Sequence, residues 1–143
     1  MECVFCELIR EDTARWVARE ADICAFTPLT PLAPGHTLVV PITHFTDVFD
    51  TPPDVLAATM GLVQRVAAAM RTALDASGVN ILSAGGPGSE QSVPHLHFHV
   101  VPRWVDDGIS TWPTGQSRRR PTGDPRTQLA AALNRDHTPH HRS

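Results

Sequence analysis

The sequence contains no lysine and no tyrosine, and all twelve basic residues among its 143 are arginine. Without lysine, the chain has no side-chain amine that can form a Schiff base or act as a lysine nucleophile. The remaining candidates for covalent or acid–base chemistry are histidine, cysteine, serine and the carboxylates.

Long apolar runs are also missing, since no stretch approaches the ~20 residues needed to span a bilayer. The N-terminus carries no basic and apolar signal segment, so we expect a cytoplasmic protein with no membrane partner. The formal net charge of -3 gives no general reason to expect a nucleic-acid partner. The length suits one domain, or one domain with a tail, and allows a real core.

Cysteine is scarce, and the odd count of three is a poor basis for a disulfide framework. Cys3 and Cys6 are spaced C-x-x-C, which favours half a zinc site or a redox pair, although two surface thiols without a metal remain an alternative. A redox pair usually opens a helix within a βαβ pattern, and that context is absent here. Zinc needs two further ligands, for which spare histidines such as His36 and His44 are available. Cys24, in an apolar stretch, is expected to be a small buried residue.

Three histidines alternate with apolar residues in the segment from Pro94 to Pro102. Because side chains alternate across a strand, this spacing predicts a strand with all three imidazoles on one face, about 6.5–7 Å apart. A phosphate or a metal ion fits among side chains at that spacing. We therefore interpret the segment as functional. Its histidines are His95, His97 and His99.

Further strands are predicted around this segment from β-branched runs and turn residues. A hairpin is expected over 16–19 and 22–26, a strand over 36–41 after a proline-rich loop, and another over 79–83. A short helical turn is expected to follow Cys6. The apolar spacing after residue 51 predicts a long amphipathic helix with Thr51 as its N-cap, which ends near Gly78.

A glycine-rich loop over residues 84–90 directly precedes the histidine segment. Glycines allow backbone N–H groups to approach an anion closely, so Gly85 and Gly86 are candidate phosphate contacts. The loop lacks the lysine and the spacing of a P-loop. A flexible hairpin connection is the structural alternative.

The regular patterns end after Trp104. We therefore divide the chain into a catalytic domain over 1–104 and a loop-rich extension over 105–143 with one possible short helix at 127–133. The arginine run at 118–120 is interpreted as a solvated linker rather than a phosphate contact. The histidines at 137, 140 and 141 are interpreted as a solvated end rather than a metal site.

Two kinds of chemistry are compatible with the alternating histidines. A neutral imidazole can attack phosphorus and carry a nucleotidyl group, with its neighbours stabilising phosphate charge or protonating the leaving group. His97, which has a histidine on each side, is then the natural nucleophile. Alternatively, the three histidines hold a catalytic metal in a hydrolase. Spacing alone does not separate the two.

Two motifs resemble the histidine triad (HIT) superfamily: Pro34-Gly-His-Thr-Leu-Val-Val-Pro41 and Gln91-Ser-Val-Pro-His-Leu-His-Phe-His-Val-Val101. The C-x-x-C pair strengthens the similarity to bacterial, zinc-containing members. The resemblance covers about residues 3–103. It implies an α+β fold: an antiparallel sheet of about five strands with one long helix, a short N-terminal helix and a flexible C-terminal tail. It further implies a homodimer and a nucleotidyl hydrolase or transferase that acts at the α-phosphate of a nucleotide conjugate.

The resemblance also implies roles for individual residues. His97 resembles the nucleophile, and His99 and His36 its hydrogen-bonding partners. Gln91 and Ser92 match residues that contact phosphate and leaving group, and Gly85, Gly86 and His99 complete the expected substrate contacts. His95 corresponds to a metal ligand of zinc-bearing relatives. A closed structural zinc site is therefore expected, with no catalytic metal required; its ligands are Cys3, Cys6, His44 and His95.

Three positions depart from the family pattern. Pro28 stands where many relatives have an acidic residue that grips the ribose, Ala84 replaces a common asparagine, and Glu90 replaces a small residue. Asn80 and Asp22 are candidate substitutes for the lost ribose contact. Because of these departures, a nucleotide-binding regulatory protein with little turnover is the alternative function.

Overall fold

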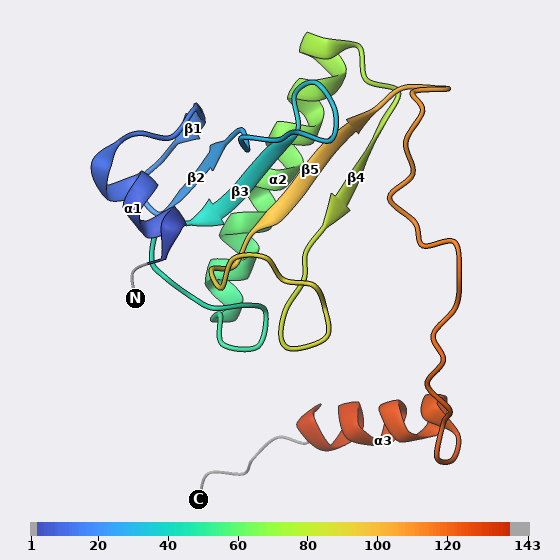
Figure 1. The fold of residues 1–143 in the computed structure, drawn as a ribbon. Coiled ribbons are helices and arrows are strands. Elements are labelled where there is room, and N and C mark those ends of the chain that lie inside the picture. The colour runs from blue at the N-terminus through green and yellow to red at the C-terminus, as the bar shows by residue number, and fades with distance from the viewer. Residues whose placement is uncertain (1–2, 138–143) are drawn as a thin grey trace, which may run out of the picture. The chain divides into compact units, whose positions relative to one another are not determined.

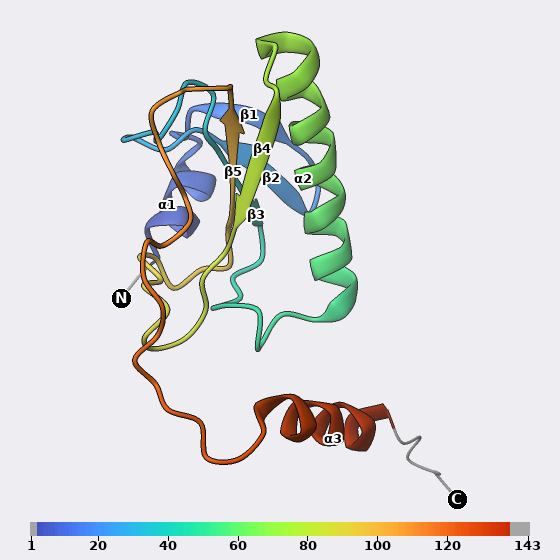
Figure 2. The same ribbon diagram turned by 90° about the vertical axis from the view of Figure 1, so that its right-hand side faces the viewer.

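The computed structural model describes residues 3–137. The chain divides between Ile109 and Ser110 into two compact units, each of which is described by itself. In the first unit, an antiparallel sheet has α2 on one face and α1 on the other (Figures 1 and 2). This α+β architecture confirms the expected fold. No helix among the described residues is long and apolar enough to cross a membrane.

The sheet has five strands in the order β1-β2-β3-β5-β4. Their bounds are β1 Trp16–Arg19, β2 Ile23–Phe26, β3 Thr37–Pro41, β4 Gly78–Leu82 and β5 Phe98–Arg103. All neighbouring pairs are antiparallel. The 36-residue separation between β3 and β4 is filled largely by α2, which spans Pro53–Leu74.

The alternation of side chains along β2 and β3 produces two apolar layers, because both faces of these strands are buried. One layer packs against α2 and includes Ala25, Val39 and Val100. The other packs against α1, which spans Val4–Glu11, and includes Phe26 and Leu38. Cys24 is fully buried in this second layer, as predicted, and burial raises the pKa of its thiol to about 11.

The strand predicted from residue 94 is wrong at its beginning, because β5 starts at Phe98. The ladder to β3 ends with Val39 opposite Phe98, and its continuation would place Leu96 opposite Pro41. Proline has no N–H to donate to a ladder. The N–H of Leu96 instead donates to the carbonyl of Phe45, at 2.7 Å.

The predicted caps of α2 also differ from the structure. Thr51 is not the N-cap: its hydroxyl donates to the Asp47 carbonyl at 2.6 Å, and Pro52 occupies the cap position. The helix ends before Gly78, at Leu74, because Asp75 adopts the left-handed conformation with φ of 54°. Gly78 instead opens β4.

The second unit begins with a segment that has no helix or strand through residue 124. It continues into α3, Pro125–His137, which contains the short helix expected at 127–133. The histidines at 140 and 141 lie outside the described residues.

Candidate active site

Three histidine side chains meet on the sheet face that carries α1. His99 is part of β5 and pairs in register with Leu38, while His36 directly precedes β3. The ring centroid of His99 lies 5.0 Å from that of His97 and 5.2 Å from that of His36. His36 and His97 are only 3% and 4% exposed. The structure thus brings together the three residues expected to be catalytic, although 63 positions separate His36 from His99.

Backbone hydrogen bonding assigns the tautomers of His36 and His99. The N–H of Leu32 donates to Nδ1 of His36 at 3.0 Å, so this nitrogen carries a lone pair and the proton is on Nε2. His36 Nε2 then donates to Nδ1 of His99, also at 3.0 Å. The proton of neutral His99 is therefore on Nε2, which makes that nitrogen a hydrogen-bond donor.

His97 has the opposite tautomer. Its Nδ1 lies 2.7 Å from the backbone carbonyl of His95, an acceptor only, so Nδ1 carries the proton. The Nε2 of His97 is left with a lone pair. The pair His97 and His99 therefore offers one nucleophilic nitrogen beside one proton donor.

All three imidazoles are held neutral by their surroundings. Burial lowers the pKa of His36, and burial lowers that of His97 against the opposing hydrogen bond to His95. The pKa of His99 falls to about 4, because of burial and then because of the repulsion it would feel from His97 and His36. At neutral pH the site is a set of neutral imidazoles rather than a cationic cluster.

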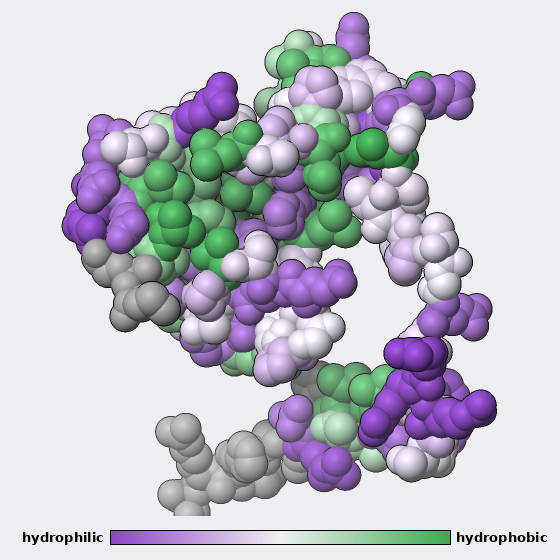
Figure 3. All heavy atoms as spheres, viewed as in Figure 1, coloured by the Kyte–Doolittle hydropathy of each residue, from purple (hydrophilic) through white to green (hydrophobic). Residues whose placement is uncertain are grey.

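A cavity of about 340 Å³ opens at His97 and His99. Its wall is largely apolar and comes from α1 and the facing strands, including Phe5, Leu8 and Phe26. Figure 3 shows hydrophobic residues gathered on this face of the first unit between hydrophilic margins. An apolar cavity with a few convergent polar groups is the usual form of a small-molecule site.

The residues expected to contact substrate fall into two groups. Ser92 lines the cavity beside the histidines. Gln91, Gly85 and Gly86 lie in the preceding loop, outside the described lining: Gln91 Nε2 donates to the Thr46 carbonyl at 2.6 Å. The loop is closely packed at Gly85, because a Cβ there would lie 3.1 Å from the Cβ of Asp47. Gly86 has φ of +85°, a backbone conformation that favours glycine.

Beside His36, His97 and His99, which we call the triad, two thiols and two imidazoles form a second cluster. His95 Nδ1 lies 3.4 Å from Cys3 Sγ and 3.5 Å from Cys6 Sγ, and His44 Nδ1 lies 3.4 Å from Cys6 Sγ. All four ligand atoms lie within 4.8 Å of one another. Tetrahedral zinc with bonds of about 2.3 Å to sulfur and 2.0–2.1 Å to nitrogen sets sulfur–nitrogen edges of about 3.6 Å. The donor set therefore fits a closed tetrahedral metal site.

His95 links this cluster to the triad. It is fully buried, and its Nε2 donates to the Pro41 carbonyl at 2.8 Å, which directs the Nδ1 lone pair toward the thiols. Its own carbonyl accepts the Nδ1 proton of His97. The ring of Phe5, between Cys3 and Cys6 in sequence, contacts both His95 and His97 edge-on.

Residues 10–105, which make up most of the first unit, match the family model of the HIT domain. The chain belongs to the HIT family. An adenosine 5'-monophosphoramidase of Saccharomyces cerevisiae is 31% identical over 92% of this chain and 82% of its own length. An adenylylsulfatase of Arabidopsis thaliana is 32% identical over 82% of this chain and 59% of its own length. The crystal structure of a zinc-bound histidine triad family protein from Mycobacterium smegmatis has a TM-score of 0.72 and 36% identity, covering 95% of this chain and 96% of that one.

The cavity at His97 and His99 includes one of the three positions that depart from the family pattern. Pro28 contributes to its wall, and no carboxylate is among its described lining residues. Asn80 and Asp22 do not replace the missing contact. The Asn80 side chain accepts a hydrogen bond from Arg103, and Asp22 lines a different pocket.

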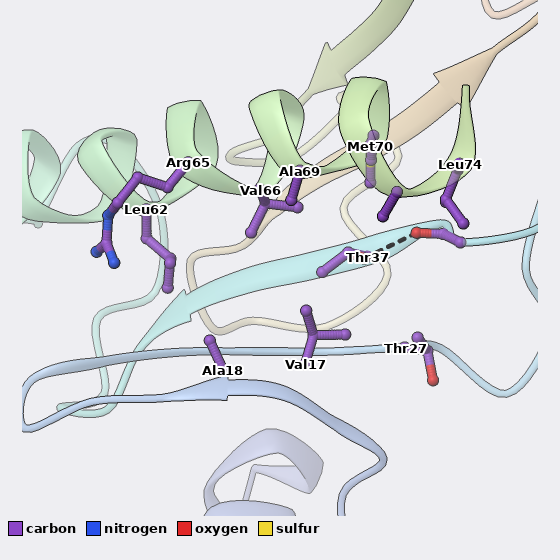
Figure 4. A pocket seen from close by; sticks show the side chains of 12 residues that line it. Val17, Ala18, Thr27, Thr37, Leu62, Arg65, Val66, Ala69, Met70 and Leu74 are labelled. Atoms are coloured by element: carbon purple, nitrogen blue, oxygen red, sulfur yellow. Dashed lines mark hydrogen bonds between the residues drawn. The ribbon is translucent and has the colours of Figure 1, made fainter. Parts of the chain in front are cut away.

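The HIT domain has another apolar cavity, of about 390 Å³, between α2 and β1 (Figure 4). Its wall includes Leu62, Val66 and Met70, which point from α2 toward the sheet. Its charged lining residue, Arg65, is paired with Glu20 at 2.7 Å. The described lining of this cavity includes no histidine, cysteine or carboxylate, so the cavity at His97 and His99 is the candidate active site.

Several lining residues were not expected from the sequence. Phe5, Arg15 and Thr27 all contribute to the triad cavity, but each lies in a short segment without a catalytic motif. The amphipathic pattern of α1 is the one signal that indicated a buried face for Phe5. The position of that face over His97 depends on packing that the local pattern does not contain.

Proposed function

We propose that the chain is a nucleotidyl hydrolase or transferase that cleaves nucleotide conjugates at the α-phosphate through a covalent nucleotidyl-His97 intermediate. The observation that carries this proposal is the opposed tautomers of His97 and His99 at the end of one cavity. The activities named for the yeast and plant relatives are consistent with it.

In the first step, the Nε2 lone pair of His97 attacks the α-phosphorus. The N–P bond forms while the bond from phosphorus to the leaving oxygen or nitrogen breaks, and its electron pair leaves with that atom. The Nε2–H of His99 donates a hydrogen bond to the leaving atom, which takes its proton from solvent water as it departs, so His99 stays neutral. His97 becomes a cation in the intermediate, and its Nδ1–H bond to the His95 carbonyl stabilises that charge.

In the second step, water attacks the same phosphorus and the N–P bond breaks. The electron pair of the N–P bond returns to Nε2 of His97, the proton of the attacking water passes to solvent, and the Nε2–H of His99 hydrogen-bonds the attacking oxygen, so both tautomers are kept. His36 holds the other nitrogen of His99 throughout and so fixes the ring orientation. The net reaction is hydrolysis, or transfer where another acceptor replaces water.

We propose further substrate contacts beside the histidines. Ser92 shares the cavity wall with His97 and His99 and binds a phosphate oxygen or the leaving group in this scheme. The loop with Gly85, Gly86 and Gln91 supplies backbone N–H groups and one amide for the rest of the phosphate chain. The base packs on the apolar wall formed by Phe5 and its neighbours.

We assign zinc to the cluster of Cys3, Cys6, His44 and His95. Two thiolates and two imidazoles fill a tetrahedral coordination shell, which is typical of structural zinc. The zinc-bound mycobacterial relative supports this assignment. The metal fixes His95 and thereby the carbonyl that orients His97. The proposed chemistry requires no catalytic metal.

The test is chromatographic release of adenylate from adenosine phosphoramidate and diadenosine polyphosphates with a chelator present. Wild type is compared with His97→Ala, and Arg71→Gln on the outer surface of α2 serves as a control. We expect release by wild type and the control, and none by His97→Ala, whose circular dichroism stays native. Denaturing mass spectrometry of quenched wild type should show one adenylyl adduct on the peptide that contains His97. Full activity of His97→Ala contradicts the mechanism.

The alternative is a nucleotide-binding regulatory protein of the same fold. The cavity lining favours it, because no carboxylate among the described lining residues is available to bind ribose hydroxyls. Tight adenylate binding without turnover supports this alternative. Activity that a chelator abolishes while the zinc of the Cys3, Cys6, His44 and His95 cluster stays bound, and that an added divalent ion restores, instead supports the metal-dependent hydrolase.

We further propose that residues 1–104 form the catalytic domain, that 105–143 form an extension, and that the protein is a homodimer. β4 supports the dimer, since it is an edge strand and Ile81 on it is 44% exposed. Light scattering after size exclusion tests this directly. A monomer at micromolar concentration contradicts the dimer.

A further inference from the structure

The wall of the triad cavity is apolar over most of its surface and polar at a few positions. Its wall is apolar where α1 faces the sheet, with Phe5, Leu8 and Leu38 among the lining residues. At one end lie the neutral histidines, which are suited to the reacting phosphate. Apart from Ser92, the remaining polar lining residues are Thr13 and Arg15, which precede β1, and Thr27, which follows β2.

Arg15 is the single charged side chain among the described residues that line this cavity. No aspartate or glutamate in the described lining balances it. A ribose with two free hydroxyls is bound well by hydrogen-bond acceptors, whereas a guanidinium has donors only. The charge of this cavity therefore fits an additional anion on the ligand better than an unmodified ribose.

The guanidinium of Arg15 is also available for a ligand. Its neighbour Arg19 is occupied, because it pairs with Asp12 and lies 4.6 Å from the centroid of the Trp16 ring. Asp12 accepts a further bond from Trp16 Nε1 at 2.7 Å. Arg15 has no ion pair with any described residue. Its backbone is fixed, since its carbonyl accepts the N–H of Thr27 at 3.0 Å.

From this arrangement we infer that the cavity selects nucleotide conjugates whose ribose carries a second phosphoryl group, which Arg15 binds. The inference rests on the proposed function and names its substrate class. A phosphate monoester accepts two parallel N–H bonds from one guanidinium, so Arg15 alone can bind the added group. Arg15 is a specificity residue in this scheme, not a catalytic one.

The test is calorimetric binding to the full chain of three probes: adenosine 5'-monophosphate, adenosine 2',5'-bisphosphate and adenosine 3',5'-bisphosphate. We expect at least one bisphosphate to bind about tenfold more tightly than the monophosphate, equal to about 1.4 kcal/mol. Higher salt should reduce this ratio, because the added contact is ionic and near the surface. The 2' and 3' probes identify the position of the phosphate.

The matched variants are Arg15→Gln and Arg71→Gln, which remove the same charge from exposed sites. The preference should vanish in Arg15→Gln and persist in Arg71→Gln, with unchanged melting temperatures in both. Equal affinities in wild type, or a preference that survives Arg15→Gln, overturn the inference.

Adenylate release separates this inference from the proposed function. His97-dependent release without a bisphosphate preference overturns the inference alone. An Arg15-dependent preference without release overturns the hydrolase and leaves the inference as a property of a binding protein. If none of the three probes binds, the inference is overturned, and if adenylate release is absent as well, the proposed function is overturned with it.

Discussion

Loss of the metal should release α1 before the rest of the fold. The perturbation is His44→Ala, because His44 is the exposed member of the ligand cluster and its truncation opens no cavity in the core. The matched control is Thr43→Ala, an exposed neighbour outside the cluster. Three ligands then remain, and we expect the affinity for zinc to fall sharply.

The size of the effect follows from the contacts of α1. The helix has eight residues, and it buries Phe5 and Ile9 against the sheet. Burial of these two side chains contributes about 3–6 kcal/mol, whereas ordering eight backbone residues costs about 8–16 kcal/mol. Hydrogen bonds within α1 offset part of the excess of the ordering cost over the burial free energy. A helix of eight residues is nevertheless only marginally stable by itself. We therefore expect the bonds from Cys3 and Cys6 to the proposed zinc to hold α1 in place.

We expect His44→Ala to lower the free energy of unfolding by about 3 kcal/mol and the melting temperature by roughly 10 °C. Amide hydrogen exchange should accelerate over residues 4–11 and remain slow in β2, β3 and β5. Adenylate release should fall as well, since Phe5 no longer packs against His97. Metal content by atomic absorption should be near zero, compared with one equivalent in Thr43→Ala.

The reasoning is refuted if amides 4–11 are as protected in metal-free His44→Ala as in wild type. In that case α1 holds by its own apolar contacts. Unchanged zinc content in the variant would instead remove His44 from the ligand set.

Two further predictions concern the sheet and its turns. The pKa of His99 is about 4 in the fold, below the ordinary value near 6.5, so the unfolded chain binds more protons between those values. The free energy of unfolding should therefore fall as pH drops from 6.5 toward 4, and it should fall less in His99→Asn. Urea unfolding at several pH values measures this, and equal slopes of unfolding free energy against pH in the two proteins would contradict the prediction. Gly35→Ala should cost about 1–2 kcal/mol, since φ is +91° there and the new Cβ would lie 2.5 Å from Leu74. Gly61→Ala is its control, because nothing lies within 4 Å of a Cβ in mid-helix, and it should stabilise by about 0.5–1 kcal/mol; the opposite ranking of urea midpoints would show that the reasoning is wrong.

Much of the secondary structure was predictable because the signals are local. The amphipathic spacing after residue 51 predicted α2, and β-branched runs predicted β3 and β4 to within one or two residues. The errors occurred where one residue changes the backbone pairing. Pro41 ends the ladder before His97, and Asp75 closes α2 before the glycine expected to stop it.

The candidate site was predictable as a set of residues but not as an arrangement. The alternation of His95, His97 and His99 indicated a functional segment, and the C-x-x-C spacing of Cys3 and Cys6 indicated half a zinc site. The resemblance to HIT proteins then assigned His36 to the catalytic set and His44 to the metal ligands. Their convergence is visible only in the structure, which places Cys3 within hydrogen-bonding distance of a histidine 92 positions away. Other residues that line the cavity, such as Arg15 and Thr27, had no sequence signal.

The sequence by itself determined which side chains are available and which faces of the local elements they occupy, because periodicity is a property of a few neighbouring residues. Tertiary structure decided the proton positions. The tautomers of His36 and His99 depend on β3 lying beside β5, and that of His97 depends on a carbonyl turned toward its ring. A hydrogen bond between residues dozens of positions apart exists only after the strands have paired, so the nucleophile is defined by the fold and not by the motif alone.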